Sequence, residues 1–235
     1  MKATRLDKFL SDNTEFSRSE LKKLIHSGKA SVNGETVTIP DFKIDTDTDN
    51  IVFCGKTVEN KRFVYLLMNK PAGVLSAAND KSRQTVVDLV PEEFKHYDLF
   101  PVGRLDKDTT GLLMITNNGD YAHRVISPKY KIEKTYIADV DSVLPADLPE
   151  KFSEGIVLAD GYRCEPAKAE ILSENRIKIT VYEGKYHQIK RMLGVCGLGV
   201  NKLHRERVGG IVLPENMNFG QTVELTENEA FRVFF

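Results

Sequence analysis

The chain has 235 residues, of which 41% are hydrophobic and 29% are charged, with a formal net charge of −1. This length suits one large domain or two modest ones, and the apolar content is enough for a real core. No apolar run approaches the roughly 20 residues that span a bilayer, and the N-terminal stretch MKATRLDKFLSDN lacks the apolar core of a secretion signal. Three scattered cysteines form no C-x-x-C pair, so we expect a cytoplasmic protein without a zinc site or a membrane partner.

The charge is unevenly distributed along the chain. Residues 185–207 carry six Lys or Arg against one Glu, and residues 1–30 carry seven basic against four acidic residues. Local basic patches of this kind bind phosphate groups even when the net charge is near zero. Scattered solvated lysines explain the charge alone equally well.

Residues 5–34 predict two short helices followed by a hairpin. Apolar residues recur at helical spacing in each helix, Ser17 or Ser19 can cap the second helix, and Gly28 can end it. Asn33-Gly34 is a typical two-residue hairpin turn. A module of about 60 residues is only marginally stable by itself, so a docking role is expected. We place the boundary between a domain at 1–59 and a second domain at 60–235.

The second domain is predicted to contain more strands than helices. The polar residues 56–62 read as a linker, the apolar run 64–68 as a buried strand, and KPAG as a turn. Further strands and helices follow from period-2 and period-3.6 patterns. The strands are expected at 98–104, 111–118, 134–140, 176–182 and 222–226, and the helices at 85–94, 119–127 and 186–197. The expected fold class is α+β: a small N-terminal α/β module and a larger, mixed but mainly antiparallel sheet flanked by helices.

The stretch VGRLDKDTTGLLMITNNG, residues 102–119, places a charged loop between two apolar strands. A buried Asp106 would tend toward the neutral acid unless a cation lies close to it. Side chains alternate in an extended segment, so Arg104 can share its face while Lys107 points away. The remote HQIKRM segment offers Lys190 and Arg191 as partners. From the loop alone, a turn aspartate capping Thr109 or Thr110 is the simpler interpretation.

The N-terminal module resembles the S4 RNA-binding domain. The resemblance rests on RLDKFL, on SRSELKKLIHSGKASVNG and on the order helix, helix, hairpin. It implies that the second helix and the following loop face RNA. The implied phosphate or ribose contacts are Arg5, Ser17, Arg18, Lys22, Lys23 and Lys29, and for each of them a solvated helix face is the alternative.

The second domain resembles the pseudouridine synthases. GRLDKDTTGLL, EKTY and EGKYHQIKRM are similar to the three motifs of the branch that modifies ribosomal RNA and carries an S4 domain. NKPAGVLS, SPKYKIEKTYIADV and LHRERVGGI bring the chain closest to enzymes acting on small-subunit (16S) RNA. Large-subunit (23S) RNA is the second choice. The resemblance extends from residue 5 to about residue 230.

The resemblance implies isomerisation of a uridine within RNA, without cofactor or metal. Asp106 matches the catalytic aspartate, which attacks either the ribose C1′ or the base C6. Tyr136 matches the tyrosine that packs on the uracil and helps remove the C5 proton. Lys190 matches the cation that pairs with the aspartate; because many relatives have arginine there, lysine implies a pair without the bidentate fork. The implied RNA contacts in this domain are Arg104, which fills the gap left by the flipped base, Ile189, which packs beside the base, and Arg191, Arg205 and Arg207.

Other interpretations of the same residues were weighed. Asp106 and Asp108 could form the carboxylate pair of a glycoside or nucleoside hydrolase, although Asp108 is better explained as a brace of the loop. His187 is better explained by a structural hydrogen bond than by metal binding, and His204 by packing or by a position facing RNA. The S4-like module alone would suit a non-catalytic RNA-binding or ribosome-assembly protein. The expected partner is ribosomal RNA, naked or in a partly assembled small-subunit particle, and we expect a monomer.

Overall fold

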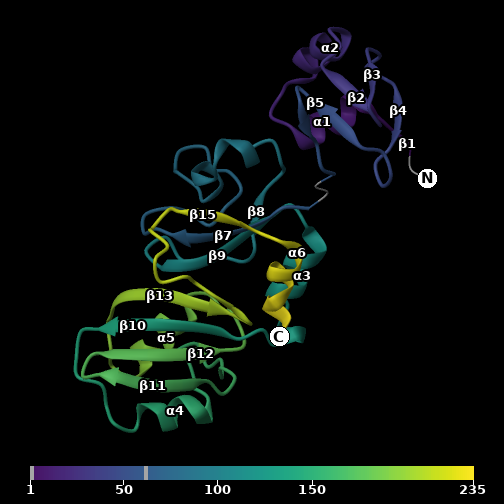
Figure 1. Cartoon of the computed structure of the whole chain (residues 1–235). Helices are drawn as coiled ribbons and strands as arrows, with labels where there is room; N and C mark the ends of the chain where they lie inside the picture. Colours follow the sequence, from purple (N-terminus) through teal and green to yellow (C-terminus); the bar gives the residue numbers. More distant parts are fainter. Residues whose placement is uncertain (1–2, 61–62) are drawn as a thin grey trace. The chain divides into compact units, whose positions relative to one another are not determined.

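The computed structural model describes residues 3–60 and 63–235 (Figure 1). The chain divides into two compact units, Met1–Val64 with Val90–Asp98, and Tyr65–Leu89 with Leu99–Phe235. This division falls a few residues after the boundary expected at residue 60, which stays a prediction. Within the described ranges, no helix is both long and apolar enough to cross a membrane.

The first unit joins two short helices to small antiparallel sheets around one apolar core. Ser17 caps the second helix and forms a capping box with Glu20, which confirms that predicted start. Asn33 and Gly34 both have positive φ, 53° and 87°, as the predicted hairpin turn requires. Its elements are β1 (Ala3–Arg5), α1 (Leu6–Asn13), α2 (Arg18–His26), β2 (Ala30–Val32), β3 (Glu35–Val37), β4 (Lys43–Asp45), β5 (Ile51–Phe53) and β6 (Lys56–Thr57), with the sheet orders β3-β2-β5-β6 and β1-β4.

The second unit is built on one large mixed sheet, to which nine strands of the described chain belong. Neighbouring strands run antiparallel except β13 and β9, which pair in parallel. At one edge of the sheet β15 pairs with β7, with Leu225 beside Tyr65. The strands expected near 134–140, 176–182 and 222–226 are confirmed. The order β11-β12-β10-β13-β9-β7-β15 can be followed in Figure 1. The strands are β7 (Tyr65–Lys70), β8 (Phe100–Pro101), β9 (Thr110–Thr116), β10 (Lys134–Val140), β11 (Lys168–Ser173), β12 (Arg176–Val181), β13 (Val200–Val208), β14 (Ile211–Val212) and β15 (Thr222–Leu225).

The helices of the second unit agree only in part with the sequence. The two helices expected near 119–127 and 186–197 are confirmed, whereas the helix expected at 85–94 is wrong. Two 3₁₀ turns replace it, Val87–Leu89 in the second unit and Glu92–Phe94 in the Val90–Asp98 segment of the first unit, because Pro91 has no N–H group and disfavours a helical residue before it. The α-helices are α3 (Gly119–Ile126), α4 (Leu148–Glu154), α5 (Gln188–Val195) and α6 (Glu227–Phe231); further 3₁₀ turns lie at Pro128–Tyr130 and Arg232–Phe234.

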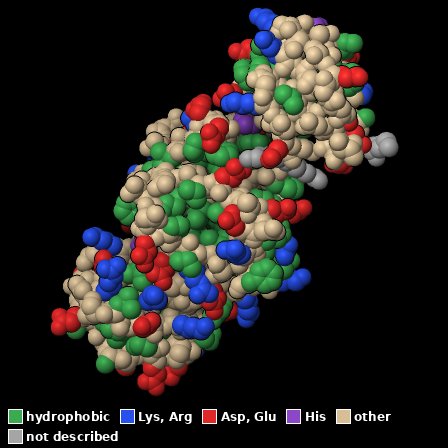
Figure 2. Space-filling model, viewed as in Figure 1, with side chains coloured by type: hydrophobic (Ala, Val, Ile, Leu, Met, Phe, Trp, Pro, Cys, Tyr) green, Lys and Arg blue, Asp and Glu red, His purple; other side chains and the backbone are tan. Residues whose placement is uncertain are grey.

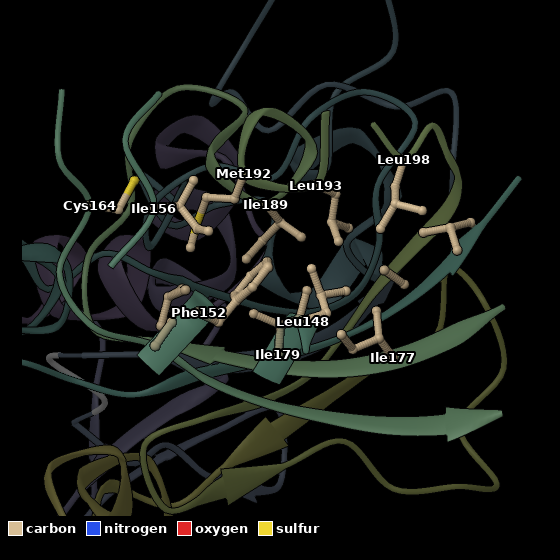
Figure 3. Close-up of a cluster of buried hydrophobic side chains, with 14 of the residues drawn as sticks. Leu148, Phe152, Ile156, Cys164, Ile177, Ile179, Ile189, Met192, Leu193 and Leu198 are labelled. Carbon is tan, nitrogen blue, oxygen red and sulfur yellow. The ribbon is translucent and has the colours of Figure 1, made fainter. Parts of the chain in front are cut away.

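Helix α5 is anchored to the sheet through its apolar face. Ile189, Met192 and Leu193 are buried in one cluster with Phe152 of α4 and Ile179 of β12 (Figure 3). Burying each such side chain contributes roughly 1.5–3 kcal/mol. The helix is therefore fixed on one side, and its other side carries Lys190 and Arg191.

Strands β9 and β13 approach so closely at one point that only glycine fits there. Gly111 pairs with Arg205, and its φ of +105° lies outside the range that other residues favour. A Cβ atom on Gly111 would lie 2.3 Å from the carbonyl oxygen of Arg205. The end of the charged loop is thus pressed against a strand that comes from much later in the chain.

Replacing Gly111 by alanine is expected to lower the free energy of unfolding by about 2–4 kcal/mol, because the new methyl group must push the two strands apart. Chemical denaturation measures the change. Gly119→Ala is the matched control, since its Cβ would meet open space at an ordinary φ, and it should be neutral or slightly stabilising. Equal stability of the two variants would contradict a tight contact at Gly111.

Candidate active site

A fully buried lysine binds the backbone of the charged loop that contains Asp106 and Asp108. Lys70, the last residue of β7, is 0% exposed, and its Nζ donates hydrogen bonds to the carbonyl oxygens of Pro71 (2.9 Å), Lys107 (3.2 Å) and Thr109 (2.9 Å). Burial, opposed by the carboxylates of Asp108 and Asp106, lowers the pKa of Lys70 to about 8. The ammonium group therefore fixes the backbone on both sides of Asp108.

Gly73 and Ser76, which follow Lys70, also bond the backbone of the loop, and we call these three residues the cradle of the loop. The Gly73 N–H donates to the Lys107 carbonyl at 2.8 Å. The Ser76 hydroxyl donates to the Leu105 carbonyl at 2.8 Å and accepts the Leu105 N–H at 3.0 Å. The sequence predicted a turn at KPAG, and NKPAGVLS contributed to the family resemblance. Neither predicted these contacts, because a lysine at the end of an apolar run gives no sign of its burial. Its observed role is to hold the loop on either side of Asp106.

The Asp106 carboxylate has a separate neighbour for each oxygen. Oδ1 lies 3.3 Å from Nε2 of His187, and Oδ2 lies 3.5 Å from Nζ of Lys190. The Asp106 side chain is 25% exposed, so it is partly withdrawn from water but still open to a ligand. Both neighbours come from the start of α5, about eighty residues further along the chain.

Lys190 lies closer to Asp108 than to Asp106. Its Nζ is 2.6 and 2.8 Å from the two Asp108 oxygens, and this hydrogen bond holds the pKa of Asp108 below its usual value. The expected pair with Asp106 is therefore one half of a bridge between two carboxylates. A glycoside hydrolase needs one carboxylic acid that stays protonated, and the lowered pKa of Asp108 speaks against Asp108 in that role.

Four of the expected site residues line a single cavity of about 70 Å³. They are Arg104, Asp106, Tyr136 and Ile189. Ile189 is 4% exposed and forms part of the apolar wall, whereas Arg104 is exposed at the mouth. The structure thus brings together side chains from the loop, from β10 and from α5.

Tyr136 is backed by a buried arginine. Arg205 is 5% exposed; its Nε donates to the Leu112 carbonyl at 2.8 Å and its Nη1 lies 3.5 Å from the Tyr136 hydroxyl. The pairing of β10 with β13 shifts register between Thr135 and Tyr136. Arg207, another expected RNA contact, pairs with Glu133 at 3.2 Å and does not line this cavity.

His187 was not assigned a site role from the sequence. Its backbone is left-handed, with φ of +49°, immediately before α5, and its ring stacks on Tyr186 at 3.8 Å between centroids. A non-glycine residue in this conformation costs roughly 1–2 kcal/mol, which the surrounding contacts must offset. No local pattern predicts such a residue. A second missed residue is Thr109, which lines the cavity while its hydroxyl is buried without a hydrogen-bond partner in the described structure.

The remaining expected RNA contacts lie elsewhere. Arg191 pairs with Asp160, and Arg5 forms a two-point pair with Asp7 at 2.9 and 2.7 Å. His204 bonds the Thr110 hydroxyl at 2.9 Å. Within residues 3–60 and 63–235, no group of three or more side chains could hold a metal ion. Four other expected contacts, all in the first unit, are exposed and form no ion pair with any described carboxylate: Arg18, Lys22, Lys23 and Lys29.

A cavity that joins a held carboxylate to an aromatic ring and basic side chains defines an enzyme site suited to a nucleotide. Residues 64–194 match the RNA pseudouridylate synthase family, and residues 4–50 match the S4 domain. The chain belongs to the RNA pseudouridylate synthase family and carries an N-terminal S4 domain, as the sequence motifs implied.

Similar proteins cover the whole chain. The ribosomal small subunit pseudouridine synthase A of Vibrio cholerae is 40% identical over 98% of this chain and 99% of its own. The ribosomal large subunit pseudouridine synthase B of Bacillus subtilis is 39% identical over 97% of this chain and 95% of its own. A crystal structure of a pseudouridylate synthase, 33% identical, superimposes with a TM-score of 0.69 over 98% of this chain and 99% of that one. The expected fold class and enzyme class are thereby confirmed.

The lowered pKa of Lys70 makes stability depend on pH in a predictable direction. Between about pH 8 and the ordinary lysine pKa near 10.4, the unfolded chain holds a proton that the folded chain has released, so this group makes stability rise with pH. Lys70→Met should lose that rise. The difference in unfolding free energy between wild type and variant should therefore move by about 3 kcal/mol in favour of wild type from pH 7 to pH 10.5.

Denaturation series at the two pH values measure this difference, with Lys151→Met as the control. Lys151 is exposed on α4, and its pKa is raised by Asp147, so its removal should give a much smaller shift of the opposite sign. A Lys70→Met variant with the pH dependence of wild type would show that this ammonium keeps its proton throughout.

Proposed function

We propose that this enzyme converts a specific uridine of 16S ribosomal RNA to pseudouridine. The relative from Vibrio cholerae is named for the small subunit and matches over nearly full length. NKPAGVLS and LHRERVGGI give the same assignment from the sequence. The Bacillus subtilis relative named for the large subunit is almost as similar, so 23S RNA is the second candidate substrate.

The observation that carries the proposed mechanism is the placement of Asp106. Its carboxylate opens into the cavity that Tyr136 lines, while His187 and Lys190 each lie beside one oxygen. A carboxylate attacks as the anion, and an ammonium group close to it stabilises that negative charge. Asp106 attacks either C1′ of the ribose or C6 of the base, and both routes begin from this same geometry.

The reaction balances without any added reagent. The bond between N1 and C1′ breaks, the uracil turns, and a bond forms between C5 and C1′. The bond that Asp106 forms on attack, to C1′ or to C6, breaks again before product leaves and returns the free carboxylate. The proton on C5 leaves and N1 gains one. Tyr136 packs on the uracil and takes part in removing the C5 proton, and Ile189 provides the apolar wall beside the base. Arg104, exposed at the mouth, fills the gap in the RNA that the flipped uridine leaves.

The S4 domain supplies affinity for RNA. Its exposed cations on and after α2, Arg18, Lys22, Lys23 and Lys29, contact the phosphate backbone, and Arg5 and Arg191 contribute less because each is already paired with a carboxylate. Residues 1–59 form this module and residues 60–235 the catalytic domain. The substrate is ribosomal RNA, naked or within a partly assembled small-subunit particle, and the enzyme acts as a monomer.

Asp106→Asn is expected to reduce pseudouridine formation at least about a thousandfold, because the amide is no nucleophile. Binding of RNA should change by less than about twofold, since the cradle of the loop remains. The assay incubates undermodified 16S and 23S RNA, and assembling small-subunit particles, with each protein and maps pseudouridine by chemical probing. Asp120→Asn, an exposed position on α3, is the control and should be fully active. Equal product from Asp106→Asn would end the catalytic assignment, and product in 23S RNA alone would replace the 16S assignment.

The double variant Lys22→Gln/Lys23→Gln is expected to weaken RNA binding about tenfold and to reduce the slope of log K against log salt by about 1–2, as for one or two lost phosphate contacts. The control Lys43→Gln/Lys56→Gln removes the same charge from exposed strand positions of the same unit. If both variants weaken binding equally, the second helix has no special role in docking.

A further inference from the structure

A second cavity adjoins the catalytic one. It has a volume of about 100 Å³ and shares Arg104, Tyr136 and Gly184 with its neighbour. A water molecule needs only roughly 10–15 Å³ measured in this way, so there is room for a group of several heavy atoms. Apolar side chains form much of its wall: Val102, Met114, Val125, Ile126 and Val208.

The charged residues that line this cavity are all basic. They are Arg104, Lys134 and Arg205, and no Asp or Glu lines it. Lys134 donates to the Ile132 carbonyl at 2.8 Å. Among the described residues, the Arg205 side chain makes polar contacts with the Leu112 carbonyl and the Tyr136 hydroxyl, and its guanidinium lies near the Tyr136 ring. In the described chain neither forms an ion pair with a carboxylate. Two residues further along β13, Arg207 does have such a partner in Glu133.

Such an arrangement is costly in the free protein. A buried charge without a counter-charge is unfavourable, and partnership with carbonyl oxygens offsets only part of the cost. Arg205 is buried and Lys134 is partly buried; desolvation and the nearby Arg205 lower the pKa of Lys134 to about 8. The fully buried Lys70 is a further cation near Arg205, although Asp108 and Asp106 compensate part of its charge. An anion entering the cavity would remove this imbalance.

The substrate limits which anion this can be. At neutral pH the phosphodiester groups are the anionic groups of RNA, and arginine and lysine are their usual partners. A uridine whose base lies against Tyr136 has a phosphate on each side of its ribose, only a few bonds from the reacting carbon. The second cavity lies against the same tyrosine and the same Arg104.

We propose that the second cavity binds a phosphodiester group adjacent to the target uridine, held by Lys134 and Arg205. This inference rests on the proposed function of the neighbouring cavity. The contact would fix the ribose relative to Asp106, and its cations would be neutralised only when substrate is in place. In this role Lys134 and Arg205 are binding residues for the sugar–phosphate backbone and read no base.

The test replaces single phosphates of the RNA by neutral groups. An RNA fragment containing the mapped uridine is made with one methylphosphonate on its 5′ side, or on its 3′ side, with the same 2′-O-methyl sugar in the charged reference. Binding is measured in the Asp106→Asn background, so that no turnover occurs. One of the two neutral linkages should weaken binding at least about fivefold, whereas a neutral linkage several nucleotides away should have a smaller effect.

The variant Lys134→Met then tests whether Lys134 is the residue that contacts this phosphate. On fully charged RNA it should weaken binding by a similar factor and reduce the salt slope by about 0.7, while the neutral linkage should have no further effect in this variant. Lys151→Met, on α4 and outside both cavities, removes the same charge and should leave the effect of the neutral linkage as in wild type. Lys134→Arg should restore binding.

The outcomes separate this inference from the proposed function. If neither flanking methylphosphonate weakens binding to the Asp106→Asn protein that is otherwise wild type, the inference is overturned whether or not the Lys134 variants fold. If the losses from Lys134→Met and from the neutral linkage simply add, Lys134 does not contact that phosphate and the assignment fails. Pseudouridine formed by the wild-type enzyme on the unmodified RNA shows in either case that the proposed function stands; absence of product in every RNA tested overturns the function itself.

Discussion

The geometry of the site depends on the hydrogen bonds that the buried Lys70 ammonium donates to three carbonyl oxygens. It joins the end of β7 to the backbone on both sides of Asp108, and Ser76 adds a reciprocal bond at Leu105. A loop with so many charges would otherwise prefer many conformations in water. Because Lys70 and Ser76 fix the carbonyl groups of the loop, the carboxylates of Asp106 and Asp108 are held close to Lys190 of α5.

The rest of the site combines buried apolar side chains that fix α5 with polar side chains that reach Asp106. Helix α5 is held by Ile189, Met192 and Leu193, so that Lys190 and His187 reach Asp106 from a rigid element (Figure 3). The close contact between Gly111 and Arg205 ties the loop to β13 and puts a guanidinium behind Tyr136. The exposed surface shown in Figure 2 mixes Lys and Arg with Asp and Glu, in keeping with a near-zero net charge. Binding of a polyanion by this enzyme therefore depends on local groups of cations.

The sequence predicted what local chemistry determines. The Ser17 cap, the Asn33-Gly34 turn and the apolar strands beside the charged loop follow from short-range preferences, and motif resemblance selected Asp106, Tyr136 and Lys190. It did not predict contacts that only the tertiary fold creates. Lys70 is buried because its carbonyl partners surround it, His187 adopts a left-handed backbone because α5 and the loop require it, and Lys190 is closest to Asp108, which lies on the same loop. Pro91 overrode an apolar pattern that otherwise suited a helix.

The pairing of β7 with β15 has a consequence for how the protein is made. The apolar core cluster of the first unit consists of residues at or before Val58, whereas the large sheet gains its edge strand β15 only when Leu225 lies beside Tyr65. At the usual rate of about 5–20 residues per second, the intervening chain takes many seconds to emerge. A nascent polypeptide therefore contains the core of its S4 domain well before the sheet of its catalytic domain has received its last strand.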